Sequence, residues 1–118
     1  MQRTTLAGII PLLLLLATGE ATAHATLDHA EPRVGNKVAV LPREVTLWFT
    51  QKLEQAFSSI TVTNAAGQRV DIGKARVSGN QMSVALRPGS SGIYRVNWRV
   101  LSVDAHTAQG DFTFEVGQ

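Results

Sequence analysis

The feature that most restricts the fold of this chain is a two-residue repeat of apolar side chains. Five segments carry the repeat: 45–49, 60–63, 82–86, 93–100 and 112–116. Residues two apart in a β-strand face the same side of a sheet, whereas the faces of a helix repeat every 3.6 residues. The sequence therefore predicts half-buried strands, and we find no convincing amphipathic helix after the first 23 residues.

Residues that favour turns separate these segments. They are Pro32, Gly35, Pro42, 64–67, 79–80 and 88–92. Short strands joined by frequent turns are typical of antiparallel pairing. Each sheet then has one apolar face to bury, which favours an all-β fold, a small Greek-key β-sandwich. A small closed barrel is the alternative.

The first 23 residues have the composition of a secretory signal peptide. A short basic start precedes the apolar run 6–17, and the small residues of 21–23 predict cleavage after Ala23. A helix needs about 20 apolar residues to cross a bilayer, whereas a signal needs only about 7–15. The alternative is an uncleaved N-terminal anchor, which Pro11 disfavours because it interrupts the run.

Residues 24–118 are enough for one compact domain. The chain ends soon after an alternating segment, so we expect no membrane span in the mature protein and a separate protein as any membrane partner. The 11 Lys or Arg and 9 Asp or Glu are too evenly balanced to indicate nucleic-acid binding. The chain has no cysteine, which excludes disulfides, thiolate ligands and a cysteine nucleophile.

Cleavage after Ala23 would place His24 at the N-terminus. An N-terminal histidine offers a metal two nitrogens, the α-amine and the nearer ring nitrogen, in one chelate ring. The intrinsic pKa of an α-amine is about 7.7–8.0, so a metal displaces its proton readily near neutral pH. The alternative is that a histidine lies at the cleavage site by chance.

Asp104 and His106 follow the most apolar of the predicted strands. On an extended backbone, residues two apart point the same way, so a carboxylate oxygen and an imidazole nitrogen could meet at one point. Nitrogen and oxygen donors in a tetragonal arrangement suit Cu(II). The alternative is that both are simply polar residues at the end of a strand, because this motif is short and common.

Several short motifs are spread over nearly all of the mature chain: residues 24–27, 31–32, 35, 41–42, 45–49, 92–100, 102–106, 110, 112, 114 and 116. In these motifs the chain resembles the CopC-type periplasmic copper proteins. The resemblance implies a cupredoxin-like or immunoglobulin-like sandwich. It also implies one Cu(II) ion per mature chain, held by the amine and ring of His24 together with Asp104 and His106.

The chain departs from that family in two respects. Ala105 stands where the family usually has glycine, so we expect a loop conformation that accepts a β-carbon. Some members carry a methionine-rich loop for Cu(I), whereas this mature chain has only Met82, which its spacing places in a core strand. We therefore expect a Cu(II)-only protein.

The remaining histidine and the large aromatic residues have simpler interpretations. We expect His29 to be a solvated loop residue, although it could approach the copper or a second ion. Trp48, Tyr94 and Trp98 lie in alternating strands and are interpreted as core aromatics.

The function predicted from these residues is copper binding in the periplasm, as a chaperone or buffer that carries out no reaction. A CopD-type membrane protein is the partner that the resemblance suggests. One alternative is a copper-dependent oxidative enzyme, because lytic polysaccharide monooxygenases also hold copper with an N-terminal histidine. The other is a metal-free immunoglobulin-like binding module.

Overall fold

The computed structural model describes residues 26–117, and two four-stranded sheets account for most of them. The strands are β1 (Leu27–Glu31), β2 (Lys37–Val38), β3 (Glu44–Phe49), β4 (Ser59–Thr63), β5 (Asp71–Ser78), β6 (Gln81–Leu86), β7 (Gly92–Leu101) and β8 (Thr107–Val116). A 3₁₀ turn, η3 (Gln55–Phe57), precedes β4.

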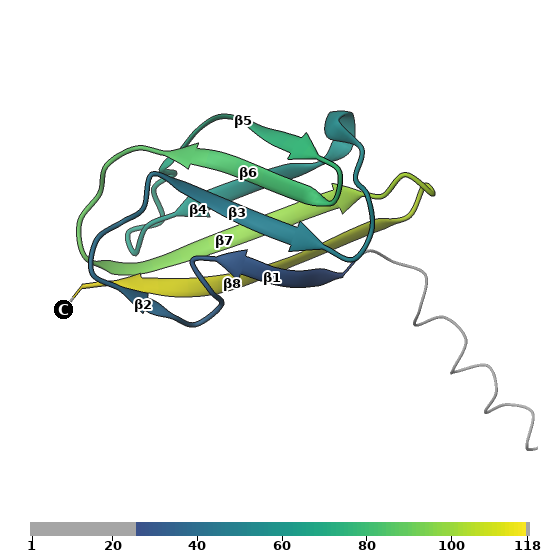
Figure 1. Cartoon of the computed structure of the whole chain (residues 1–118). Helices are drawn as coiled ribbons and strands as arrows, with labels where there is room; N and C mark the ends of the chain where they lie inside the picture. Colours follow the sequence, from purple (N-terminus) through teal and green to yellow (C-terminus); the bar gives the residue numbers. More distant parts are fainter. Residues whose placement is uncertain (1–25, 118) are drawn as a thin grey trace, which may run out of the picture.

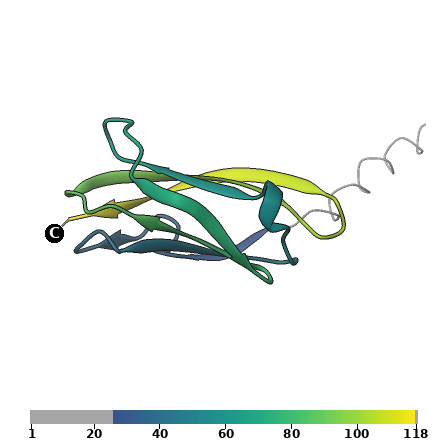
Figure 2. The same cartoon turned by 90° about the horizontal axis from the view of Figure 1, so that it is seen from above.

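The two sheets lie face to face as separate layers (Figures 1 and 2). One sheet has the strand order β1-β3-β6-β5 and the other β2-β8-β7-β4. The expected all-β sandwich is confirmed, and the closed barrel is excluded because the sheets do not join. Neighbouring strands are antiparallel, as expected, with one exception: β2 runs parallel to the end of β8.

The core lies between the sheets and is formed mainly by residues that the two-residue repeat placed on one face, together with Ala30, Leu53, Val70 and Ala75. Val45, Leu47 and Phe49 of β3 are at most 1% exposed, and Met82 is fully buried opposite Leu47. Tyr94 is also buried, and Trp98 packs against the core, edge-on to Phe49. Met82 and Tyr94 thus occupy the core positions that their spacing predicted.

Strands β1 and β5, which the two-residue repeat did not predict, are irregular. The pairing of β1 with β3 shifts register between Leu27 and His29, and that of β5 with β6 shifts between Ile72 and Arg76. Gly73, in the second shift, has a φ of 74°. One extra residue in β1 and two in β5 interrupt the alternation of faces, which is why these strands lack the pattern in the sequence.

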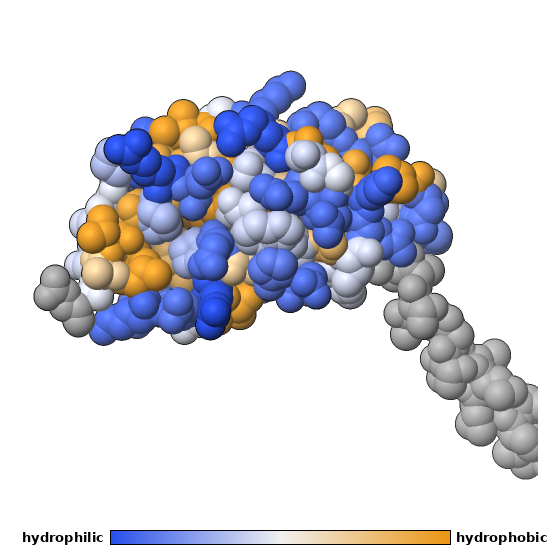
Figure 3. All heavy atoms as spheres, in the orientation of Figure 1, coloured by the Kyte–Doolittle hydropathy of each residue, from blue (hydrophilic) through white to orange (hydrophobic). Residues whose placement is uncertain are grey.

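The face of the sandwich seen in Figure 3 is mostly hydrophilic, with apolar residues in small separate groups. The large apolar residues that are exposed are Val34, Val40, Phe57, Ile72, Ile93 and Val103. Between residues 26 and 117 the structure contains no helix long and apolar enough to cross a membrane.

Candidate metal centre

The candidate site lies on the loop that joins β7 to β8. These two strands pair over ten residues each, from Gly92 opposite Val116 to Leu101 opposite Thr107. Such a long paired hairpin holds both ends of the connecting loop, residues 102–106. The loop projects from one end of the sandwich (Figure 1).

Asp104 and His106 meet within this loop. The Nδ1 atom of His106 lies 3.3 Å from the Oδ1 atom of Asp104, and the two side chains are 44% and 45% exposed. The backbone between them is a turn, not the extended segment expected from the sequence. The structure therefore brings the two side chains together, as predicted, but by a different local geometry.

Ala105 explains the turn. Its φ is 72°, the left-handed conformation that glycine adopts without cost. The expectation that alanine here would change the loop to a conformation open to a β-carbon is wrong. The loop instead keeps the left-handed backbone that suits glycine. Hydrogen bonds outweigh the strain of placing alanine in this conformation, and one of them is donated by the Ala105 N–H to the Ser102 carbonyl at 2.8 Å.

The surroundings of Asp104 favour its charged form. The hydrogen bond donated by the Ser102 hydroxyl lowers the pKa of Asp104 below its ordinary value, and desolvation acts in the opposite direction. The hydrogen bond and the charge of His106 lower this pKa further. A carboxylate that remains ionised well below neutral pH is ready to bind a cation without losing a proton.

His24 lies outside the described residues. The first described residue, Thr26, is tied to the end of β3: its carbonyl accepts a hydrogen bond from Thr50 N–H at 3.0 Å. Two residues further on, the Lys52 carbonyl accepts from Val103 N–H at 3.0 Å, inside the loop. The described chain thus begins at the same end of the sandwich as Asp104, as Figure 1 also shows.

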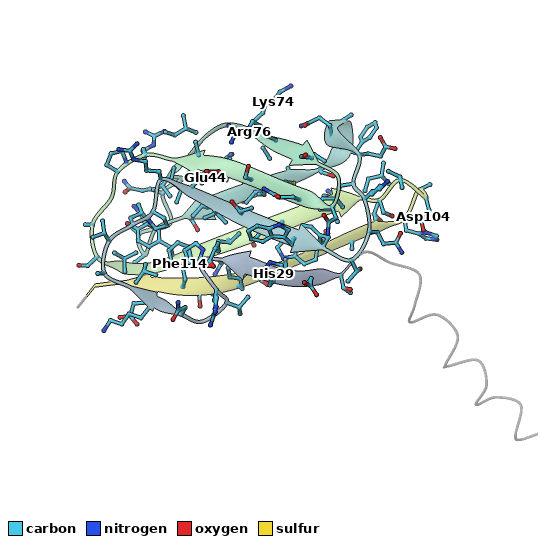
Figure 4. All side chains as sticks on the ribbon, in the orientation of Figure 1. His29, Glu44, Lys74, Arg76, Asp104 and Phe114 are labelled. Atoms are coloured by element: carbon cyan, nitrogen blue, oxygen red, sulfur yellow. The ribbon has the colours of Figure 1, made fainter. Side chains whose placement is uncertain are left out.

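His29 occupies a different place. The expectation was a solvated loop residue. His29 lies on strand β1, so the loop position is wrong, but its side chain is 56% exposed to solvent. Its ring stacks on Trp48 with centroids 4.4 Å apart, and its Nδ1 lies 2.7 Å from Asp28 Oδ2. Figure 4 shows His29 on the sheet face, away from Asp104 at the loop.

The same stack corrects the interpretation of Trp48. Trp48 is half-buried on the outer face of its sheet, whereas its neighbours Leu47 and Phe49 enter the core. An aromatic residue in a strand faces the core only if its position in the alternation places it there. Trp48 belongs to the other set of positions, so the prediction that it is a core aromatic is wrong.

The described residues alone do not complete a metal site. Among residues 26–117, no group of three or more His, Cys, Asp or Glu side chains is arranged to hold a metal ion. Asp104 and His106 supply one oxygen and one nitrogen donor, which is a donor set of the kind that Cu(II) accepts.

Comparison with known proteins gives a consistent result. Residues 27–117 match the family model described as the CopC domain. Copper resistance protein C of Xanthomonas campestris pv. juglandis is 32% identical over 117 residues, which cover 92% of this chain and 91% of the relative. Protein YobA of Escherichia coli K12 is 31% identical over 108 residues, covering 86% and 85%.

A longer relative and two solved structures are also similar. The copper transport protein CutJ of Bacillus subtilis is 28% identical over 114 residues, but the match covers only 21% of its length. The crystal structure of CopC from Methylosinus trichosporium OB3b has a TM-score of 0.74 and 31% identity, covering 80% of this chain and 94% of that one. The structure of PcoC from Escherichia coli, titled a methionine-rich copper resistance protein, has a TM-score of 0.70 and 30% identity, covering 80% and 99%.

Proposed function

The chain belongs to the CopC family, and from this premise we propose that it is a periplasmic protein that binds one Cu(II) ion. Its role is to carry or buffer copper, and it carries out no reaction. The observation that carries the proposal is the contact of 3.3 Å between Asp104 and His106 on an exposed loop. A carboxylate with a lowered pKa beside an imidazole provides anionic oxygen and nitrogen donors in one place.

The remaining donors in this proposal come from His24. In this proposal residues 1–23 are a signal peptide that directs export to the periplasm, and its cleavage leaves His24 as the first residue. Thr26 is held at the same end of the sandwich as the loop, and two extended residues span about 7 Å. The proposal requires the α-amine and ring of His24 to reach Asp104 and His106, and the position of Thr26 at this end of the sandwich supports it.

The names of the relatives support a copper-handling role. They include copper resistance and copper transport proteins, and none of those named above is described as an enzyme. In this proposal, copper is cargo that a CopD-type membrane protein receives. An assay for oxidase activity of the copper-loaded protein with reductant tests the alternative of an oxidative enzyme.

A His106→Ala variant tests the site, with His29→Ala as a matched control. Both histidines are exposed, but only His106 contacts Asp104. Loss of a group that only orients a metal ligand typically weakens metal binding by roughly 10–100-fold. We expect His106→Ala to weaken Cu(II) binding by more than this, because it removes a ligand, and to alter the paramagnetic resonance spectrum. The control should bind like the parent. Unchanged affinity and spectrum in His106→Ala would remove this residue from the site.

The position of the N-terminus gives a second test. Protein that begins at Ala23 has an amide nitrogen at His24 in place of an amine, and an amide binds copper only after a costly deprotonation. We expect weaker Cu(II) binding than in protein that begins at His24, with the same β-sheet content by circular dichroism. Equal affinities of the two preparations would exclude the amine as a ligand.

A further inference from the structure

Ser102 is a buried polar residue at the base of the candidate loop. It follows β7 directly, forms an isolated β-bridge with Leu53, and is 0% exposed. The other residues that are buried to this degree are apolar side chains of the core. A hydroxyl group is costly to bury unless it makes hydrogen bonds, so its partners indicate what it does.

The partners of Ser102 are the residues of the loop. Its hydroxyl donates to Oδ1 of Asp104 and also lies 3.1 Å from the His106 carbonyl oxygen. Its backbone N–H donates to the same carbonyl at 2.9 Å, and its own carbonyl accepts from Ala105 N–H at 2.8 Å. One buried residue therefore contacts the side chain of one candidate ligand and the backbone of the other.

The segment that holds Ser102 is itself anchored on both sides. Glu54 N–H donates to the Leu101 carbonyl at 2.8 Å, and Val103 N–H donates to the Lys52 carbonyl at 3.0 Å. The Ser102 hydroxyl thus starts from a fixed backbone and reaches out to an exposed carboxylate. A carboxylate has about four lone-pair sites, so this hydrogen bond does not prevent Asp104 from binding a cation.

We propose that Ser102 is a positioning residue that raises the affinity of the site for Cu(II) by holding the Asp104 carboxylate in its binding orientation. The inference rests on the proposed copper-binding function. Without the hydroxyl, the exposed Asp104 side chain would sample several rotamers, and the ordering cost would be added to metal binding. Removal of a group that is hydrogen-bonded to a metal ligand typically weakens metal binding by about 10–100-fold.

The test compares Ser102→Ala with Ser102→Thr, which keeps a hydroxyl, and with the control Ser58→Ala. Ser58 is a suitable control because its hydroxyl accepts from Leu101 N–H at 3.2 Å, next to Ser102, without contacting Asp104. All proteins begin at His24. The measurements are Cu(II) competition titration, the paramagnetic resonance spectrum, thermal unfolding, and the three-bond couplings that report the Asp104 χ1 angle in metal-free protein.

We expect Ser102→Ala to bind Cu(II) about 10–100-fold more weakly, with a changed copper hyperfine coupling and averaged Asp104 couplings. Ser102→Thr should restore most of the affinity, and Ser58→Ala should match the parent in affinity and spectrum. Parent-like binding by Ser102→Ala would overturn the proposal. An equal loss in Ser58→Ala would also overturn it, because the effect would then be general weakening of the loop.

The couplings of metal-free parent protein separate this proposal from the proposed function. If the parent itself shows an averaged Asp104 rotamer, Ser102 does not hold the carboxylate, and the inference fails even if Ser102→Ala does not fold. If the parent shows a single rotamer but does not bind Cu(II), the copper-binding function fails while the orienting contact remains.

Discussion

Ala105 shows how one residue can conflict with its local backbone. It is the one non-glycine residue between 26 and 117 with a positive φ, at 72°. A left-handed conformation costs an L-residue with a β-carbon about 1–2 kcal/mol. The turn persists because hydrogen bonds of Ser102 close it on both sides.

Replacing Ala105 by glycine should therefore stabilise the protein. We expect a net gain of about 0.5–1 kcal/mol, because relief of the left-handed strain exceeds the roughly 0.4–1 kcal/mol lost through a more flexible unfolded chain. Urea unfolding of metal-free protein measures the change. The control Ala39→Gly, at an exposed alanine without a positive φ, should lose stability. A loss of stability in Ala105→Gly would mean that the strain at this position is negligible.

Strands β4 and β5 belong to different sheets, and Asp71 joins them. Its side chain is 2% exposed and accepts hydrogen bonds from Val62 N–H at 2.9 Å and from Arg69 Nη2 at 2.6 Å. Burial by itself raises the pKa of Asp71, but the hydrogen bonds from Arg69 and Val62 and the charge of Arg69 outweigh it. The resulting pKa is lower than the ordinary value.

An Asp71→Asn variant should lose about 1–3 kcal/mol at neutral pH, because charged hydrogen bonds to a buried group are lost. A carboxyl group with a lowered pKa stabilises the folded state fully above its unfolded pKa, and this contribution disappears as pH falls through the folded pKa. The parent should therefore lose stability more steeply than Asp71→Asn below about pH 4.

Denaturant unfolding across this pH range measures both effects. The control is Glu44→Gln, which removes an exposed ion pair with Arg76 at 3.7 Å. Exposed pairs contribute about 0–1 kcal/mol, so this variant should differ little from the parent. Parallel pH profiles of the parent and Asp71→Asn would contradict the assignment of a lowered pKa to Asp71.

The distribution of sulfur over the whole molecule sets the expected copper oxidation state. The chain has no cysteine, and Met82, its one methionine besides Met1, is fully buried between the sheets. Cu(I) prefers soft sulfur ligands, whereas amine, imidazole and carboxylate donors suit Cu(II). We expect that reduction weakens copper binding and that the Met82→Leu variant binds either oxidation state like the parent.

Two competition titrations on one preparation, aerobic with a Cu(II) chelator and anaerobic with a Cu(I) chelator, check this expectation. The reduced protein should yield its copper readily, and the oxidised protein should resist a chelator of similar strength. Tight Cu(I) retention that disappears in Met82→Leu would show that Met82 reaches the metal. The protein would then not be specific for Cu(II).

The core strands could be predicted from the sequence because each of them buries one regular face. β3, β6 and β7 carry the two-residue repeat over most of their length, and their inward residues form the core. β1 and β5 could not be predicted, because a register shift in each interrupts the repeat. Membership of an alternating strand did not predict the orientation of Trp48, because alternate positions of a strand face opposite sides and Trp48 is one residue out of phase with Leu47 and Phe49.

For the candidate site, the sequence by itself determined which donor atoms are available: the carboxylate of Asp104, the imidazole of His106 and, still as a prediction, the amine and ring of His24. Only the tertiary structure decided how Asp104 and His106 meet. They converge through a left-handed residue and a buried Ser102 anchored on neighbouring segments. The hydrogen bonds that anchor this segment, from Val103 N–H to the Lys52 carbonyl and from Glu54 N–H to the Leu101 carbonyl, join residues that are distant in the sequence, so no local pattern of residues could have revealed them.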